Sequence, residues 1–322
     1  MTERENFLIA YHHGKPAWTP CFFDAYFPMG SRLLNNQGEF MKGGRDMFGV
    51  NWLVTADTGY QAIADPNEHL FDDVTRWQEF VRFPDPDAMD WERAAAADLV
   101  NADQNEKMIA FFGIEGNYLR LQSMMGVCEA MIAMMDEPEA VYDFFNAYTD
   151  FKIKTIQKVA RYYRPDIYVD GDDVCSSTGL FFSPELYKQL IKPFEMRVGK
   201  AVLDCGMILE HHLCGKCEML IPDIVERGAT IWQTAQSMND LAGIKRRYGD
   251  TLLIHGGWDS YGPHNAENAA EEQVRAEVRR CINDYGRDGN FALFPIILGD
   301  PAGGSVERRR NWVRDECHKL RL

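Results

Sequence analysis

The sequence predicts a (β/α)8 barrel, the α/β fold in which each of eight parallel strands is followed by a helix. Short, continuously apolar runs rich in β-branched and aromatic residues recur along the 322-residue chain, as in strands covered on both faces. Long segments between these runs can hold crossover helices, which is typical of parallel βαβ units. A doubly wound open sheet is the rival architecture, and eight strands favour the closed barrel.

The expected elements follow the chain in order. Strands are expected at Ala17–Phe23, Asn51–Thr55, Met108–Gly113, Asp166–Val169, Met207–His212, Thr230–Thr234, Leu252–His255 and Phe291–Pro295. Crossover helices are expected within Glu137–Tyr163, Pro184–Leu203, Lys216–Arg227, Asn239–Tyr248 and Ala266–Asp284. Ser183 and the pair Asn239-Asp240 are typical capping residues for two of these helices. We therefore expect one barrel domain over residues 1–322, with an N-terminal extension.

The stretch 65–91 departs from this alternation. It contains three prolines and many acidic residues. We interpret it as an insertion that packs over the mouth or the edge of the barrel.

Composition excludes several classes of function. The formal net charge is −15, and such a surface repels nucleic-acid phosphates and anionic lipid headgroups. The charged start Met1–Asn6 lacks the apolar region of a signal peptide, and no run approaches about 18 apolar residues. The eight cysteines are scattered and form no disulfide-rich pattern. We expect a cytoplasmic enzyme with reduced thiols, and no role at a membrane or on nucleic acid.

A metal-ready pair stands at one predicted strand end, because chemistry in α/β barrels sits at the carboxyl ends of the strands. His212 and Cys214 are two residues apart, so on extended backbone they point the same way. Zinc accepts imidazole and thiolate together. A third ligand could come from Cys217 or Glu210, or from more distant residues, namely His255, Asp172 and Asp259. The alternative is a buried histidine beside inert core thiols, and the sequence leaves both open.

Other polar residues follow neighbouring strands. Three carboxylates lie in Asp170-Gly171-Asp172-Asp173, a pattern that binds a cation or holds one acid with a raised pKa. In His255–Ser260, paired glycines either admit a ligand close to the backbone or make a tight turn. The candidate catalytic residues are His255, Asp172, Asp173 and Tyr118, and the candidate substrate contacts include Gln233 and Asp259. The chain has no P-loop, no strand-following GxGxxG, no GxSxG and no HExxH motif.

These residues resemble a known family. The match runs over about two-thirds of the chain, from Met108 to Pro301, through Asp170–Asp173, Ser183–Tyr187, Lys192-Pro193, His212–Gly215, Gly228-Ala229 and Leu252–Asp259. The pattern is similar to the uroporphyrinogen decarboxylase superfamily. The resemblance implies a (β/α)8 barrel with its pocket at the carboxyl ends of the strands.

The superfamily contains cofactor-free decarboxylases and zinc-dependent, corrinoid-linked methyltransferases. The decarboxylases carry an arginine-rich N-terminal motif, whereas Cys21–Arg32 reads CFFDAYFPMGSR. The thiol-methylating members resemble this chain at His212 and Cys214, but their third zinc ligand is a cysteine after the last strand, and Phe294–Asp300 contains none. The N-terminal half, through Asp72–Trp77, Phe83–Asp85 and Asp90–Glu92, resembles most the veratrol- or vanillate-type O-demethylase methyltransferases.

The resemblance therefore implies an enzyme that moves a methyl group from an aryl methyl ether to a corrinoid carried by a partner protein. Zn²⁺ or an acid at the barrel mouth would assist the departing phenolate, and Phe22, Phe27, Met29 and Trp258 would hold the aromatic ring. A cofactor-free decarboxylase, a thiol methyltransferase using a methylated corrinoid protein and a non-catalytic corrinoid or tetrapyrrole binder are the alternatives. A homodimer is an open alternative to a monomer.

Overall fold

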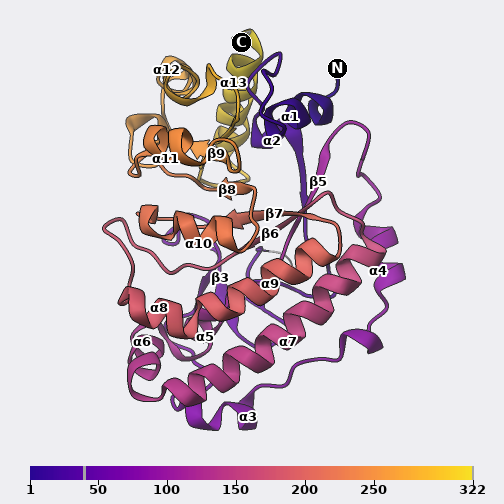
Figure 1. Cartoon of the computed structure of the whole chain (residues 1–322), viewed down its shortest axis with the longest axis vertical. Helices are drawn as coiled ribbons and strands as arrows, with labels where there is room; N and C mark the ends of the chain where they lie inside the picture. Colours follow the sequence, from indigo (N-terminus) through magenta and orange to yellow (C-terminus); the bar gives the residue numbers. More distant parts are fainter. Residues whose placement is uncertain (39–40, 321–322) are drawn as a thin grey trace.

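Seven parallel strands form one curled sheet in the computed structural model, which describes residues 1–38 and 41–320 (Figure 1). The strand order is β1-β5-β6-β7-β8-β9-β10. Cys21, just before β1, pairs in parallel with Leu293 of β10, and the Leu293 N–H donates to the Pro20 carbonyl at 2.8 Å. The first and last parts of the sheet thereby meet, and the predicted α/β-barrel class is confirmed. The strands are β1 (Tyr26–Met29), β5 (Met108–Phe112), β6 (Ile167–Gly171), β7 (Ile208–His212), β8 (Ile231–Gln233), β9 (Leu253–Gly257) and β10 (Phe291–Phe294).

Six of the eight expected strands are confirmed in the barrel sheet, a seventh is a strand of another sheet, and the expectation at Ala17–Phe23 is wrong. In Ala17–Phe23 only Cys21 pairs, and a short helix, α2 (Phe22–Ala25), precedes the strand β1 that joins the barrel. Asn51–Thr55 supplies β3 (Asn51–Leu53), which lies in a separate antiparallel sheet between β2 (Gly44–Arg45) and β4 (Ile63–Ala64). A short apolar run predicts extended backbone, but its sheet depends on long-range pairing that periodicity does not contain.

Helices surround the sheet largely as predicted. The expected helix Pro184–Leu203 is interrupted at Ile191, and Pro193 lies in the first turn of the new helix, where a residue without an N–H is tolerated and cannot continue the preceding ladder of hydrogen bonds. Ser183 and Asp240 accept the backbone N–H of Leu186 and Gly243, so both predicted caps are confirmed. The longer helices are α1 (Glu3–Tyr11), α4 (Trp91–Asp98), α5 (Asn117–Met125), α6 (Val127–Asp136), α7 (Pro138–Tyr162), α8 (Pro184–Leu190), α9 (Lys192–Asp204), α10 (Ile221–Glu226), α11 (Leu241–Tyr248), α12 (Glu271–Cys281) and α13 (Ser305–Lys319).

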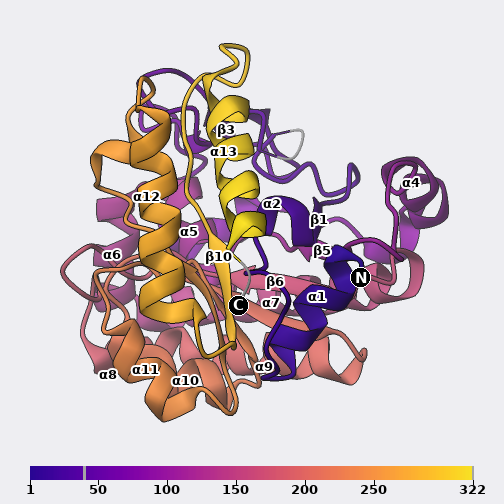
Figure 2. The same cartoon turned by 90° about the horizontal axis from the view of Figure 1, so that it is seen from above.

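Successive side chains of the barrel strands point alternately into two hydrophobic cores. One core fills the barrel from its amino-terminal end, where Phe7 and Ala10 of α1 meet Met108, Ile167 and Leu253 at the strand starts. The other core lies between the strands and the outer helices, and Phe111, Tyr168 and Trp232 belong to it. The two chain ends lie close together, since His318 of α13 pairs with Glu3 of α1 at 3.3 Å (Figure 2). None of the helices in the described residues has the length and apolar character needed to cross a lipid bilayer.

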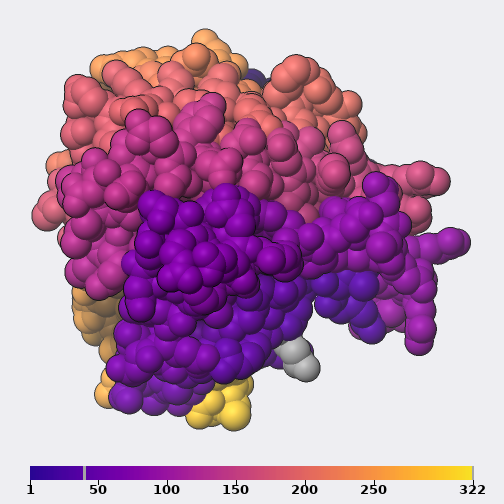
Figure 3. All heavy atoms as spheres, turned by 90° about the horizontal axis from the view of Figure 1, so that it is seen from below, coloured from indigo at the N-terminus to yellow at the C-terminus, as the bar shows by residue number. Residues whose placement is uncertain are grey.

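The acidic stretch 65–91 forms two 3₁₀ turns and the short helix α3 (Trp77–Phe80). It packs on the outer helix α7, where Trp77 contacts Phe144 and Phe83 stacks on Phe151 with ring centroids 5.4 and 5.7 Å apart. Figure 3 shows the violet atoms of N-terminal segments spread over one face beside magenta atoms of residues further along the chain.

A buried ion-pair network joins the strands to the outer helices. Asp170 of β6 points outward and accepts from Lys152 of α7 at 2.8 Å and from Arg227 at 2.6 Å. Arg227 also donates to Nδ1 of His211 at 2.5 Å. Burial raises the pKa of Asp170, but Lys152 and Arg227 outweigh burial and lower it to about 2. Asp170 and His211 therefore belong to the scaffold, and neither faces the barrel interior.

We predict that Asp170→Asn lowers the free energy of unfolding by about 3–5 kcal/mol at pH 7, because two buried cations lose their counter-charge. Because the folded-state pKa lies below the ordinary value of 3.8, the stabilisation is present above that pH and is lost as the pH falls towards about 2. Urea unfolding between pH 7 and pH 3 measures both effects. The control is Asp204→Asn, which breaks an exposed pair with Lys200 and should cost less than about 1 kcal/mol. Equal losses in the two variants would contradict the prediction.

Candidate functional site at the barrel mouth

His212 and Cys214 lie together at the carboxyl end of β7, as their spacing predicts. Nε2 of His212 is 3.7 Å from Sγ of Cys214. On the other side of the ring, Nδ1 donates to Oε1 of Gln233 at 2.7 Å, which leaves Nε2 as the nitrogen facing the sulfur. Burial lowers the pKa of His212, but Cys214 and Gln233 raise it to about 9. The hydrogen bond to Gln233 therefore orients the His212 imidazole so that its Nε2 faces the Cys214 thiol.

A polar network continues from this pair into the barrel. His212, Gln233 and His255 occupy one register level on the neighbouring strands β7, β8 and β9. One layer below them, Oε1 of Glu210 accepts from Gln233 and from Nδ1 of His255, both at 2.7 Å. Its other oxygen, Oε2, accepts from the Tyr26 hydroxyl at 2.8 Å. Glu210 was expected as a metal ligand, but both its oxygens already accept hydrogen bonds from protein donors. It therefore holds the side chains of Gln233 and His255 in place.

His255 has one partnered and one unpartnered nitrogen. The side chain is fully buried, and its Nε2 has no hydrogen-bond partner among residues 1–38 and 41–320. Aromatic rings surround the imidazole, with Phe22, Tyr26 and Phe294 at centroid distances of 6.0, 5.0 and 5.3 Å. Of the four apolar residues expected to hold a substrate ring, Phe22 is the one that faces this interior. Tyr26 was not among the predicted site residues, because its role depends on a hydrogen bond to the distant Glu210 from the first position of β1.

The other expected substrate contacts lie elsewhere. Met29 packs in the core outside the barrel, and Phe27 is partly buried against that core. Trp258 is buried with its Nε1 donating to Asn265 at 2.8 Å, and Asp259 caps the following turn by accepting from the N–H of Tyr261 at 2.9 Å. Trp258 belongs to the core between the strands and the outer helices, so it does not face the barrel interior, and a substrate contact at Asp259 stays a prediction. Gln233 does face the interior, where it orients His212.

The two glycines at the carboxyl end of β9 allow close packing. A Cβ on Gly256 would come within 2.2 Å of the Thr234 carbonyl, and a Cβ on Gly257 within 2.9 Å of the Tyr285 ring. Protein atoms therefore occupy the space that a ligand would need. At the metal-ready pair, Gly215 has a φ of +88°, and a Cβ there would come within 2.5 Å of the Ser176 carbonyl. That close approach fixes the loop after Cys214 against the loop after β6.

The carboxylates of the segment Asp170–Asp173 lie in different surroundings. Asp172 is buried and accepts the N–H groups of Tyr118 and Leu119 at 2.8 and 2.7 Å, so it holds the amino terminus of α5. Burial raises the pKa of Asp172 to about 7, against the lowering effect of these two N–H groups. The Tyr118 ring is buried against Phe182, and its hydroxyl has no partner. Of the predicted catalytic residues here, Asp173 is the half-buried one with access to open space.

The ligand set for zinc is incomplete. Cys217 is fully buried in the outer core, and burial raises the pKa of its thiol well above the ordinary value, so its expected role as a ligand stays a prediction. Within residues 1–38 and 41–320, no group of three His, Cys, Asp or Glu side chains is placed to hold a metal ion. His212 and Cys214 do fit as a pair, since a tetrahedral zinc with bonds of about 2.1 and 2.3 Å separates N and S by roughly 3.6 Å. Gln233 supplies the second hydrogen bond that ligating histidines usually make.

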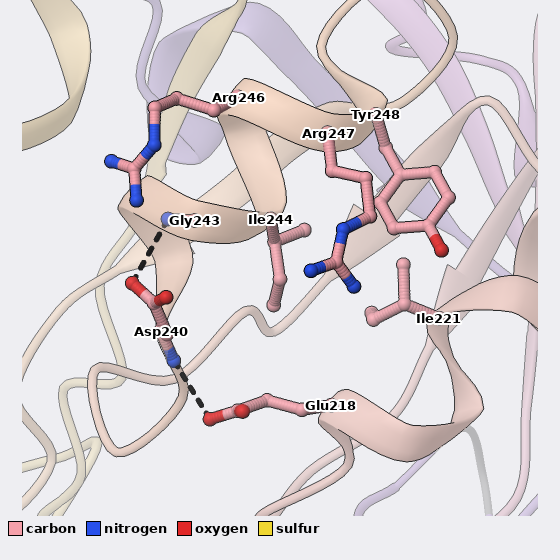
Figure 4. A pocket seen from close by; sticks show the side chains of 8 residues that line it. All are labelled: Glu218, Ile221, Asp240, Gly243, Ile244, Arg246, Arg247 and Tyr248. Carbon is pink, nitrogen blue, oxygen red and sulfur yellow. Dashed lines mark hydrogen bonds between the residues drawn. The ribbon is translucent and has the colours of Figure 1, made fainter.

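Two hollows lie outside this interior network. A cavity of about 620 Å³ borders the mouth, and Asp173 is among its lining residues. A second hollow of about 330 Å³ lies between α10 and α11 on the outside of the barrel (Figure 4). Its two carboxylates serve local structure, because Asp240 caps α11 and Glu218 accepts the Asp240 N–H at 2.8 Å. None of the strand-end site residues lines that second hollow.

The fold and this site define an α/β barrel with a histidine–cysteine pair and a buried carboxylate–histidine pair at one mouth. Residues 70–293 match the family model described as uroporphyrinogen decarboxylase. The match covers more than half of the chain, so the protein belongs to the uroporphyrinogen decarboxylase family.

A solved methyltransferase structure shares the fold. A methyltransferase from Methanosarcina mazei superimposes with a TM-score of 0.69 at 14% identity, over 98% of this chain and 99% of that chain. A D-psicose 3-epimerase from Clostridium cellulolyticum H10, solved with D-tagatose, gives a TM-score of 0.40 at 11% identity over 71% of this chain and 81% of that one. A sequence search found no significant match among curated proteins.

We predict that Glu210→Gln lowers the free energy of unfolding by about 1–3 kcal/mol, because one acceptor oxygen becomes an amide that faces donors. Urea unfolding followed by circular dichroism measures the loss. Glu139→Gln on the exposed face of α7 is the matched control and should leave the midpoint unchanged. A Glu210→Gln protein as stable as the wild type would show that the three hydrogen bonds are not required.

Proposed function

We propose that this protein is a methyltransferase that moves a methyl group from a small aryl methyl ether to a corrinoid carried by a partner protein. The observation that carries the proposal is the His212–Cys214 pair, with 3.7 Å between Nε2 and Sγ at the barrel mouth. Membership of the uroporphyrinogen decarboxylase family and a barrel shared with a methyltransferase support it.

The proposed reaction breaks the bond between the methyl carbon and the phenolic oxygen. Cobalt(I) of the corrinoid supplies the electron pair for the new carbon–cobalt bond and becomes methylcobalt(III), and the phenolate leaves and takes a proton. A phenolate is a poor leaving group, so assistance at the oxygen is required. Zn²⁺ held by His212 and Cys214 would supply a Lewis acid at that oxygen.

The chain's own residues supply the other assistance. Glu210 accepts from Nδ1 of His255 at 2.7 Å and orients that ring. The other ring nitrogen, Nε2, has no hydrogen-bond partner within the described residues and is the atom of this pair that can interact with a substrate. Phe22, Phe112 and Phe294 keep the surroundings apolar, with ring centroids of Phe22 at 6.3 and 4.7 Å from the other two. Exclusion of water strengthens each charge interaction during the transfer.

Decarboxylation of a polycarboxylate is less well supported. Arg120 lies near the mouth, but it is buried and pairs with Asp46 at 2.5 Å and with Glu115. Lys152 and Arg227 point outward to Asp170. These cations are therefore already neutralised and do not offer a grip for substrate carboxylates.

We predict that Cys214→Ala abolishes stoichiometric zinc binding and lowers methyl transfer by at least about 100-fold, the usual scale for losing one group that stabilises developing charge. The assay mixes protein, 1,2-dimethoxybenzene and cob(I)alamin, and it follows methylcobalamin and the released phenol. Metal content is measured on protein purified without a metal-affinity tag. Cys205→Ser, at the far end of α9, is the control. Unchanged zinc and unchanged rate in Cys214→Ala would remove Cys214 from the site.

A further inference from the structure

The cavity beside the barrel mouth lies under the small antiparallel sheet. Residues from β3, β4, α5 and α6 enclose about 620 Å³, within the range of pockets that hold small molecules. Trp52, Leu119 and Val127 give it apolar walls, and Gln122 and His69 give it polar groups. Gly126, with a φ of +96°, permits the close approach, since a Cβ there would come within 2.7 Å of the His69 ring and 2.5 Å of Glu129.

The lining carries negative charge without a compensating cation. Asp65, Glu129 and Asp173 contribute carboxylates, and no lysine or arginine lines the cavity among the described residues. Asp65 is engaged by Asn51 at 3.1 Å, whereas Glu129 and Asp173 have side chains without a hydrogen-bond or ion-pair partner within the described part of the chain. An anionic ligand would lose its hydration there and meet repulsion.

The cavity adjoins the site of the proposed reaction. Gly171 of β6 pairs in register with His212 of β7, so Asp173 and Cys214 each follow neighbouring strand ends by two residues. A ligand in the cavity that extends past Asp173 therefore reaches the edge on which the His212–Cys214 pair lies.

We propose that this cavity binds the aryl methyl ether, and that its carboxylates select an uncharged ether over an aromatic carboxylate. This inference rests on the proposed methyl transfer for the identity of the ligand. It adds the location of the ligand and the residues that discriminate by charge.

The test compares binding of 1,2-dimethoxybenzene and 3,4-dimethoxybenzoate by calorimetry at pH 7.5. The uncharged ether is expected to bind at least about tenfold more tightly, and Asp173→Asn is expected to narrow that ratio. Gln122→Trp fills the cavity and should weaken ether binding by about tenfold or more, whereas Met135→Trp on the exposed face of α6 should not. Equal affinity for both compounds in the wild type, or unchanged ether binding in Gln122→Trp, overturns the proposal.

A second readout keeps the test independent of folding in the variant. Cys128 is an exposed free thiol on the cavity lining, so bound ether should slow its alkylation by N-ethylmaleimide in the wild-type protein. Peptide mass spectrometry reads the rate, with Cys205 as the internal reference. An unchanged Cys128 rate at saturating ether overturns the cavity assignment.

Methyl transfer to cob(I)alamin separates the two proposals. If Gln122→Trp transfers methyl with an unchanged KM, the cavity assignment fails and the methyltransferase proposal stands. If the ether binds in the cavity of the wild type but no methylcobalamin forms, the reaction proposal fails and the site stands.

Discussion

The buried carboxylate of Glu210 is the constraint on which the barrel interior depends. A carboxylate taken out of water is costly unless its oxygens are paired. Here Tyr26, Gln233 and His255 supply the three donors from β1, β8 and β9. Because these donors come from separate strands, satisfying one charge also fixes how the strands stand relative to one another. The orientation of His212 follows, since Gln233 uses its amide group for Glu210 and its carbonyl for His212.

Strand alternation decides which polar residues can take part in chemistry. In β7, Glu210 and His212 point inward, while His211 between them points outward to Arg227. In β6, Asp170 likewise points outward to two cations. The same sequence cluster thus supplies a scaffold ion pair at Asp170, a helix anchor at Asp172 and an open acid at Asp173. Adjacent residues in sequence therefore have three different roles.

Features that depend on residues close together in the sequence were predictable, whereas features that depend on contacts between distant strands were not. The strands β5 to β10 were predictable because each is an apolar run long enough to be distinctive. The strand β1 was missed because it has four residues, including Pro28, beside the more apolar run Ala17–Phe23. His212 and Cys214 point the same way because they are two residues apart in the sequence. The engagement of Glu210 and the burial of Trp258 depend on contacts between distant strands, which spacing does not contain.

The carboxylates around the mouth also limit which products can form there. Arg120, Lys152 and Arg227 are buried against carboxylates, and the half-buried acid Asp173 follows β6 at the edge of the mouth. An anionic product such as a phenolate is destabilised in these surroundings unless it is neutralised as it forms. The same field that disfavours a carboxylated substrate therefore makes a proton or a Lewis acid indispensable for releasing a phenolate. The His212–Cys214 pair at this mouth is the group that we propose to supply that assistance, and Glu210 contributes by orienting Gln233 and His255 beside it.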